Sequence, residues 1–158
     1  MEVDLVIRPA AACDCETIAS FNCHLAMESE GRLLDRNVVA GGVARALEHP
    51  AYCRYFVAEI QGQVIGQTMI TFEWSDWENG LIWWIQSVYI HPDYRRQGYF
   101  RKIFEWVVEQ VRQDPDAVGL RLYVDRHNQP ALATYEKLGM SRMDYLIYEL
   151  KYKQDGDS

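Results

Sequence analysis

Hydrophobic positions in the second half of the chain recur at the spacing of an α-helix. They are Phe100, Ile103, Phe104, Val107, Val108 and Val111. Steps of three and one residue place all of them on one face of a helix. The acidic residues and the proline of segment 114–116 end the pattern. The segment from residue 100 to residue 113 is therefore predicted to be an amphipathic helix.

Shorter apolar runs predict the strands. Segment 81–90 is apolar almost throughout, which is typical of a strand covered on both faces. Segments 55–60 and 64–74 have strand composition, and Gln61-Gly62-Gln63 between them predicts a hairpin turn. Further strands are expected at 5–7, 118–124 and 143–150.

Three more segments have the periodicity and ends of helices. The first follows Asp14, reaches Met27 or Glu28, and has an apolar stripe of Ile18, Phe21 and Leu25. The second follows Asp35 and stops before Pro50, with Val39, Val43 and Leu47 on one face. The last begins at Asn128 and Pro130 and ends at Gly139. The order of elements predicts an α+β sheet layered with helices, in one domain of 158 residues.

Composition excludes several classes of protein. The formal net charge is −7, and no Lys/Arg run offsets it, so we do not expect nucleic acid as a partner. No apolar run reaches the roughly 18 residues of a membrane span. The N-terminal residues have neither a basic lead nor a long apolar block, so a secretory signal is not expected. These features predict a cytoplasmic protein without a membrane partner.

The four cysteines do not have the spacing of a metal site. Cys13 and Cys15 are the only close pair, while Cys23 and Cys53 stand apart. No second pair or histidine cluster completes a set of four zinc ligands, and a disulfide scaffold is not expected in a cytoplasmic domain of this size. The prediction is no metal, and cysteines that act as ordinary small side chains.

The segment before the amphipathic helix has features of a phosphate-binding turn. A strand leads through Arg95 and Arg96 to Gly98, where the helix begins. The first N–H groups of a helix lack intrahelical partners, and the helix dipole adds partial positive charge there. Glycine lets the backbone approach a bulky anion. Neither the P-loop pattern nor G-x-G-x-x-G is present, so the turn predicts an enzyme with another phosphate-bearing cofactor.

Arg95-x-x-Gly98-x-Phe100 resembles the R/Q-x-x-G-x-G/A signature of the GNAT acyltransferase superfamily, and Val88 to Tyr94 is similar to that family's lead-in. Phe100 replaces the usual small residue. The resemblance implies the GNAT acyl-CoA N-acyltransferase fold, an α+β, three-layer arrangement in which a mixed, mostly antiparallel central sheet is flanked by helices, with residues 1–158 as a single domain. It also implies acetyl-CoA as co-substrate. The cofactor-binding residues expected in this part of the chain are Ser87, Val88, Tyr89, Ile90, Arg95, Arg96, Gln97, Gly98, Tyr99, Phe100 and Arg101.

A second pattern, Asn128-x-x-Ala131-x-x-x-Tyr135-x-x-x-Gly139-Met140, resembles a later motif of the same family. The resemblance implies that Asn128 and Ala131 lie at the pantetheine arm and that Tyr135 is the general acid near the thioester sulfur. A tyrosine of pKa about 10 stays protonated at neutral pH and can donate to a thiolate whose conjugate acid has a pKa of about 8.5. Taken alone, Asn128 is a helix cap and Tyr135 a half-buried core residue.

The proton acceptor is left open by the sequence. Many relatives have a carboxylate on the strand before the cofactor turn, where this chain has Gln86 and Ser87. Glu28 and Glu30 are the catalytic candidates that we name in their place. The other candidates are His24, Glu73, Asp76 and Glu78. Trp74 and Trp77 could form an aromatic wall for a cationic amine, or equally a packing or dimer contact.

The function predicted is that of an acetyl-CoA-dependent N-acetyltransferase, which transfers an acetyl group to a small-molecule amine by direct attack in a ternary complex. One alternative is acetylation of a protein N-terminus or lysine. Another is a non-catalytic CoA-binding module, which the missing carboxylate at Gln86 and Ser87 favours and Tyr135 disfavours. A homodimer is compatible with the family resemblance.

Overall fold

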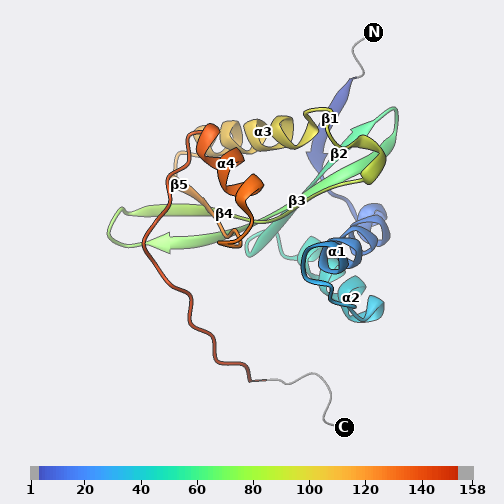
Figure 1. Ribbon diagram of the computed structural model, residues 1–158, viewed down its shortest axis with the longest axis horizontal. Helices are drawn as coiled ribbons and strands as arrows, with labels where there is room; N and C mark the ends of the chain where they lie inside the picture. The colour runs from blue at the N-terminus through green and yellow to red at the C-terminus, as the bar shows by residue number, and fades with distance from the viewer. Residues whose placement is uncertain (1–3, 153–158) are drawn as a thin grey trace. The chain divides into compact units, whose positions relative to one another are not determined.

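The computed structural model describes residues 4–152. The chain divides into two compact units, the first ending at Tyr123 and the second beginning at Val124. Residues 4–123 of the first unit contain one five-stranded sheet in the order β1-β2-β3-β4-β5 (Figure 1). Its elements are β1 (Leu5–Pro9), η1 (Ala12–Asp14), α1 (Cys15–Glu30), α2 (Arg36–Glu48), β2 (Cys53–Ile60), β3 (Gln63–Ser75), β4 (Gly80–Ile90), η2 (Pro92–Tyr94), α3 (Tyr99–Gln113) and β5 (Ala117–Leu122).

The first four strands are antiparallel neighbours, and β5 pairs parallel to β4. A parallel neighbour needs a crossover connection, and α3 forms it. The sheet is therefore mixed and mostly antiparallel, as the resemblance to the GNAT family implies.

The helices of this unit cover both faces of the sheet (Figure 1). On one face, Tyr99 and Ile103 of α3 pack against Ala58, Ile65 and Ile90. On the other face α1 and α2 form a second core, whose buried members are Ile18, Ala19, Val43, Tyr55 and Val57. The three-layer arrangement is confirmed for this unit.

The ends of the helices follow from local chemistry. Asp35 caps α2 by accepting from the N–H groups of Asn37 and Val38, as predicted. Gly31 ends α1 in the left-handed conformation, and the helix reaches Glu30, two or three residues beyond the predicted end at Glu28 or Met27. Asp14 precedes α1, but its carboxylate accepts from Arg8 and from the Ala11 N–H instead of capping this helix.

The described part of the second unit, residues 124–152, contains one helix, α4 (Gln129–Lys137). Asn128 caps it by accepting from the Ala131 N–H at 3.2 Å, and Gly139 follows it with a φ of 91°. The strand predicted to run from residue 118 to 124 ends at Leu122, within the first unit.

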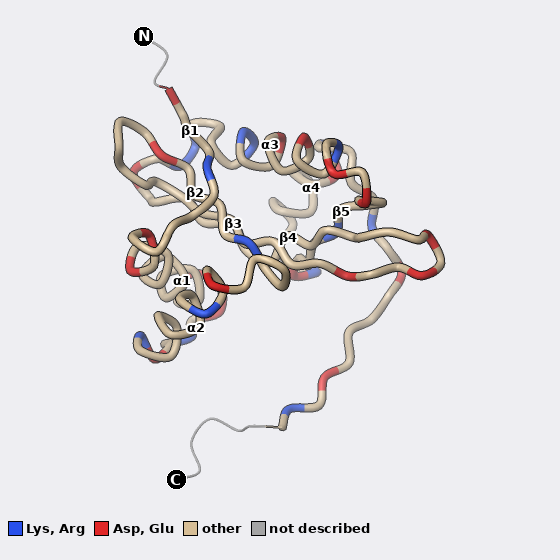
Figure 2. The backbone as a smooth tube through the Cα atoms, turned by 180° about the vertical axis from the view of Figure 1, so that it is seen from behind, with Lys and Arg blue, Asp and Glu red and all other residues tan. Residues whose placement is uncertain are grey.

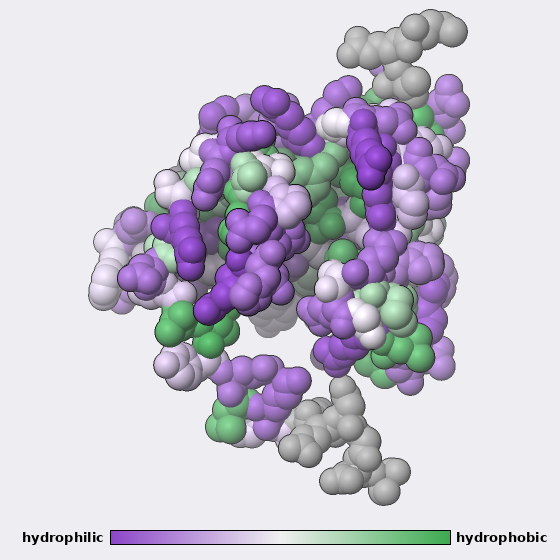
Figure 3. Space-filling view, viewed as in Figure 1, coloured by the Kyte–Doolittle hydropathy of each residue, from purple (hydrophilic) through white to green (hydrophobic). Residues whose placement is uncertain are grey.

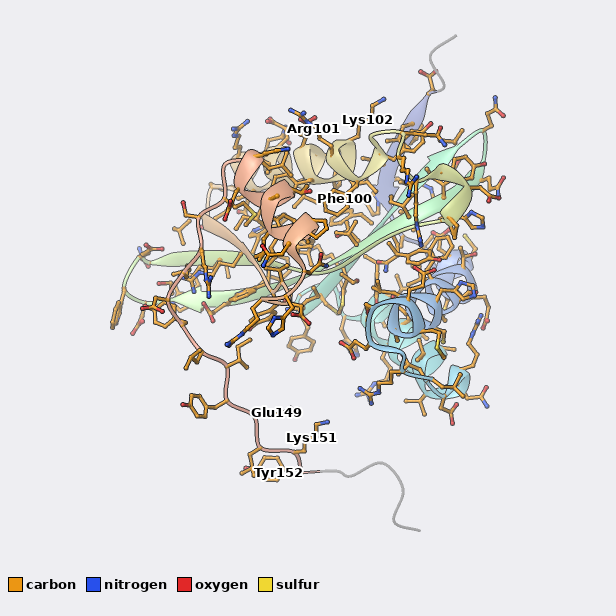
Figure 4. All side chains as sticks on the ribbon, in the orientation of Figure 1. Phe100, Arg101, Lys102, Glu149, Lys151 and Tyr152 are labelled. Carbon is orange, nitrogen blue, oxygen red and sulfur yellow. The ribbon has the colours of Figure 1, made fainter. Side chains whose placement is uncertain are left out.

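The predicted strand at residues 143–150 is wrong, because residues 141–152 have no regular structure. A strand exists only with a hydrogen-bonded neighbour, and apolar alternation cannot create one. The side chains of this segment are exposed, including Leu146, Ile147 and Tyr148 at 70%, 71% and 90%. Figure 3 shows hydrophobic atoms along the segment, and Figure 4 labels Glu149, Lys151 and Tyr152 in it.

Candidate functional site

Among the described residues, strand β4 has an edge without a strand neighbour over its last residues. It pairs with β3 as far as Ile90, but with β5 only from Leu81 to Ile85. The His91 N–H donates to the Ile65 carbonyl at 2.7 Å, which sets the direction of the backbone groups before it. Because directions alternate along a strand, the backbone groups of Val88 and Ile90 face away from β3. They therefore face the open edge.

A register shift precedes this edge. Met69 pairs with Ser87 and Ile70 with Ile85, so Gln86 is an extra residue without a counterpart on β3. The side chain of Gln86 instead donates to Thr71 Oγ1 at 2.7 Å. A bulge of this kind bends its strand and redirects the neighbouring groups.

The turn between β4 and α3 has the geometry of an anion-binding site. Gly98 is the residue before α3 and has a φ of 82°, and Arg96 also has a positive φ, of 63°. A Cβ built at Gly98 would meet nothing within 4 Å, so the space in front of the helix is open. The first turn of α3 contains no acidic residue. Figure 2 shows basic residues at the start of this helix.

The side chains that follow Gly98 divide between the core and the surface. Phe100 packs against the core between α3 and the sheet, whereas Arg101 and Lys102 point away from the sheet (Figure 4). Phe100, the departure from the family signature, therefore contributes to packing under the helix. The predicted cofactor residues from Arg95 to Arg101 all lie in this turn or in the first turn of α3.

Arg95 folds back against the sheet. Its Nε donates to the Ile90 carbonyl at 2.9 Å, its Nη2 lies 2.8 Å from Glu28 Oε2, and its guanidinium lies 5.3 Å from the Tyr89 ring centroid. Burial raises the pKa of Tyr89, and the nearby Glu28 carboxylate adds to this effect. The site thus joins the end of α1 to the end of β4.

Tyr135 lies on α4, in the second unit, and is half-buried. Burial raises the pKa of its hydroxyl above the usual value of about 10. The hydroxyl is therefore protonated at neutral pH, as a general acid must be. Asn128 and Ala131 come together in the cap of the same helix.

The other acidic candidates differ in how they are held. Glu30 is exposed at the end of α1, and Glu73 accepts from Arg121 at 3.2 Å. Asp76 and Glu78 are exposed between β3 and β4, where Figure 2 shows acidic residues at the tip of the hairpin. Glu28 is held by Arg95. His24 lies 6.4 Å from Tyr89 between ring centroids.

The tryptophans separate as strand alternation predicts. Trp83 is buried and donates to Asp114 Oδ2 at 3.0 Å, while Trp84 stacks on Tyr123 at 4.4 Å on the other face. Trp74 and Trp77 are 58% and 94% exposed near the hairpin tip.

Two polar residues that the sequence reasoning missed lie next to the bulge. Gln67 and Thr68 on β3 are 0% and 1% exposed, and both contact Ser87. Two adjacent polar residues inside an apolar strand are the signal that could have identified them.

Among residues 4–152 there is no group of three or more His, Cys, Asp or Glu side chains that could hold a metal ion. The four cysteines are free. No helix in the same range is both long enough and apolar enough to cross a membrane.

The chain is similar to proteins of a known family. The family described as Acetyltransferase (GNAT) family matches residues 20–140. The chain is 31% identical over 147 residues to the thialysine N-epsilon-acetyltransferase of Bos taurus, covering 85% of this chain and 83% of that protein. It is also similar to a possible acetyltransferase from Clostridium difficile 630, with 42% identity, a TM-score of 0.91, and 97% and 100% of the two chains covered.

An aminoglycoside N-acetyltransferase solved in complex with CoA shares the fold, with a TM-score of 0.78 at 12% identity over 97% of this chain and 98% of that one. The family match and the bovine relative each span most of the chain. The chain belongs to the GNAT family and is an acetyl-CoA-dependent N-acetyltransferase.

Proposed function

We propose that this enzyme acetylates the amine of a small molecule by direct attack in a ternary complex. The observation that carries the proposal is the open edge of β4 between the bulge at Gln86 and the turn at Gly98. The similarity to an enzyme named for thialysine, a small amine, supports the choice of a small acceptor.

The open edge and the helix start fit the two ends of acetyl-CoA. Backbone groups at an open edge can bind an amide-containing arm as they would bind another strand. The N–H groups at the start of α3 fit the diphosphate. The residues proposed to bind the cofactor are Ser87, Val88, Tyr89, Ile90, Arg95, Arg96, Gln97, Gly98, Tyr99, Phe100, Arg101, Asn128, Ala131 and Tyr135. Acetyl-CoA brings the acetyl group in activated form, as a thioester.

The chain's own residues then have three tasks. The Val88 N–H, directed at the open edge, donates to the carbonyl oxygen of the acetyl group, where negative charge develops during attack. Tyr135, whose pKa is raised by burial, donates a proton to the departing sulfur. A carboxylate takes the proton of the attacking amine, which is charged in water because its pKa is about 10.4.

Glu28 and Glu30 are the proposed proton acceptors. Glu28 is favoured by the ion pair with Arg95, which fixes its carboxylate beside β4, whereas Glu30 is exposed at the helix end. A carboxylate in a fixed position can orient a water molecule between itself and the amine.

A panel of amines tests this function. Free amino acids, diamines, and peptides with a free N-terminus or lysine would be compared by CoA release, as kcat/KM. We expect a free small amine to be the best acceptor. Preference for a peptide would favour a protein acetyltransferase, and CoA binding without turnover on any amine would favour a non-catalytic module.

We further propose that the enzyme forms a homodimer through residues 143–150. In residues 4–152 this segment has exposed apolar side chains and no strand neighbour, and β5 ends the sheet of the first unit with one edge unpaired. A segment without regular structure can adopt a strand conformation on an unpaired edge, so that each satisfies the other's backbone groups. Light scattering should show a dimer for the full chain and a monomer after truncation before Met143. A full chain that is monomeric at micromolar concentration would refute the dimer.

A further inference from the structure

Thr68 and Gln67 form a polar pair at a place in β3 where apolar side chains would be expected. Their neighbours Ile65 and Ile70 are 0% exposed, as is Gln67, and Thr68 is 1% exposed. A buried polar group destabilises the fold unless it is hydrogen-bonded. The groups to which Thr68 and Gln67 are hydrogen-bonded therefore indicate why polar residues occupy these two positions.

Both residues bind Ser87, the first residue after the bulge. Thr68 Oγ1 donates to the Ser87 carbonyl at 2.9 Å, and Gln67 Nε2 lies 3.4 Å from Ser87 Oγ. The same Nε2 donates to Asn22 Oδ1 at 3.0 Å, and Asn22 donates in turn to the Tyr55 hydroxyl at 3.2 Å. Ser87 is thus held by its carbonyl and by its side chain. Asn22 of α1 fixes the position of the Gln67 side chain that contacts Ser87 Oγ.

The carbonyl that Thr68 binds belongs to the same peptide group as the Val88 N–H. No peptide bond in the described residues is cis, so the two groups point in opposite directions. The ladder with β3 directs the Ser87 carbonyl toward β3 and the Val88 N–H toward the open edge. A donor on the carbonyl therefore fixes the direction of the N–H on the other side of the peptide.

The same donor also strengthens that N–H. A hydrogen bond to a peptide carbonyl draws electron density away from the nitrogen, and chains of hydrogen bonds polarise one another in this way. The effect is largest where water is excluded, and Thr68 is buried.

We infer that Thr68 is a positioning residue for acetyl transfer. Its hydroxyl, acting through the Ser87–Val88 peptide, orients and polarises the Val88 N–H that stabilises negative charge on the carbonyl oxygen of the acetyl group. The inference rests on the proposed function, which assigns the acetyl group to this edge. Gln67 supports the arrangement by holding the Ser87 side chain.

The experiment uses three variants of the full chain. Thr68→Val removes the hydroxyl at nearly constant volume, and Thr68→Ser retains it. Thr71→Val is the matched control, because its hydroxyl on the same strand contacts the side chain of Gln86 and not the Ser87 carbonyl. Each variant would be loaded with acetyl-CoA labelled with ¹³C at the carbonyl, without an acceptor.

The infrared stretching frequency of the labelled carbonyl reports the hydrogen bond that it accepts. We expect Thr68→Val to shift this frequency toward the value without a donor, and Thr68→Ser and Thr71→Val to leave it near that of the parent enzyme. We expect kcat to fall about fivefold to twentyfold in Thr68→Val, less than for complete removal of an oxyanion donor. The dissociation constant of acetyl-CoA should change less than kcat.

Two failures can be told apart. If the parent enzyme binds acetyl-CoA but Thr68→Val leaves both the carbonyl frequency and kcat unchanged, the role of Thr68 is refuted and the proposed function stands. If the parent enzyme does not bind acetyl-CoA, both are refuted. A fall in kcat without a change in frequency also refutes the role, since general loosening of the fold would explain it.

Discussion

The Nη2 of Arg95 lies 2.8 Å from Glu28 Oε2 and links the turn before α3 to the end of α1. The two residues are 67 positions apart in the chain. Both side chains are about two-fifths exposed, so the pair contributes little to folding stability. Its consequence is positional: the carboxylate proposed as the base is held beside the turn proposed to bind the diphosphate.

Replacement of Glu28 by glutamine tests the proposed base. We expect kcat at neutral pH to fall about a hundredfold, because general base catalysis typically contributes that much or more. Glu30→Gln is the matched control on the same helix. A Glu28→Gln enzyme with unchanged kcat would remove Glu28 from the mechanism, and a fall in kcat in Glu30→Gln alone would assign the role of base to Glu30.

Tyr135→Phe should lower kcat about a hundredfold, because the departing sulfur loses its proton donor. Calorimetry should find nearly the same affinity for CoA, since the ring is retained. Because burial raises the pKa of Tyr135, its ionisation should not reduce the activity of the parent enzyme below about pH 10. Full turnover by the variant would contradict the assignment.

Gly98→Trp should weaken CoA binding, because the indole would occupy the open space in front of α3. We expect the dissociation constant to rise about tenfold or more, equivalent to about 1.4 kcal/mol. Gly62→Trp is a close control: Gly62 has a φ of 80° against 82° for Gly98, and a Cβ there also meets nothing within 4 Å. The backbone strain of the two variants is then similar. Equal CoA affinity in both variants would show that the diphosphate binds elsewhere.

Asp14→Asn should destabilise the protein in a pH-dependent way. Asp14 is 5% exposed, and its pKa is lowered by its hydrogen bonds with Arg8 and then by the Ala11 N–H, against the opposing effect of burial. A folded-state pKa below the unfolded value of about 3.9 stabilises the fold above that pH. The stabilisation is lost as the pH falls through the folded-state pKa.

At pH 7 we expect the variant to lose about 2 kcal/mol of unfolding free energy. Below about pH 4 the difference from the parent should narrow. Glu16→Gln serves as the control, since the pair of Glu16 with Arg36 is exposed and should matter little. Chemical denaturation at several pH values measures the unfolding free energy of the parent and of both variants. A loss that stays constant down to pH 2 would mean that the Asp14 charge is not its source.

The helix and strand assignments from sequence succeeded where the signal is local. The amphipathic pattern after Gly98 predicted α3, and the apolar run before it predicted β4. The strand at residues 143–150 failed because pairing is not a local property. The same limit applies to the bulge at Gln86, which depends on the residue count of β3 as well as of β4.

The candidate site likewise contains features that the sequence predicted and contacts that it did not. The motif residues from Arg95 to Arg101 are contiguous, so the sequence places them in one turn. The contacts of Glu28 with Arg95, and of Thr68 with Ser87, join residues far apart in the chain. No spacing rule in a single sequence predicts such pairs.

By itself the sequence determined the turn at Gly98 and the helix that follows it, because dihedral preferences and hydrophobic periodicity act between near neighbours. It also carried the resemblance to the GNAT family, because the residues of each motif lie close together in the chain. Only the tertiary structure decided which backbone groups of β4 face an open edge. That depends on where pairing with β5 stops and on which residues of β4 direct their N–H and C=O groups toward β3. It also decided which acidic side chain is held beside the turn, because an ion pair between distant residues forms only when the packed sheet and helices bring them together.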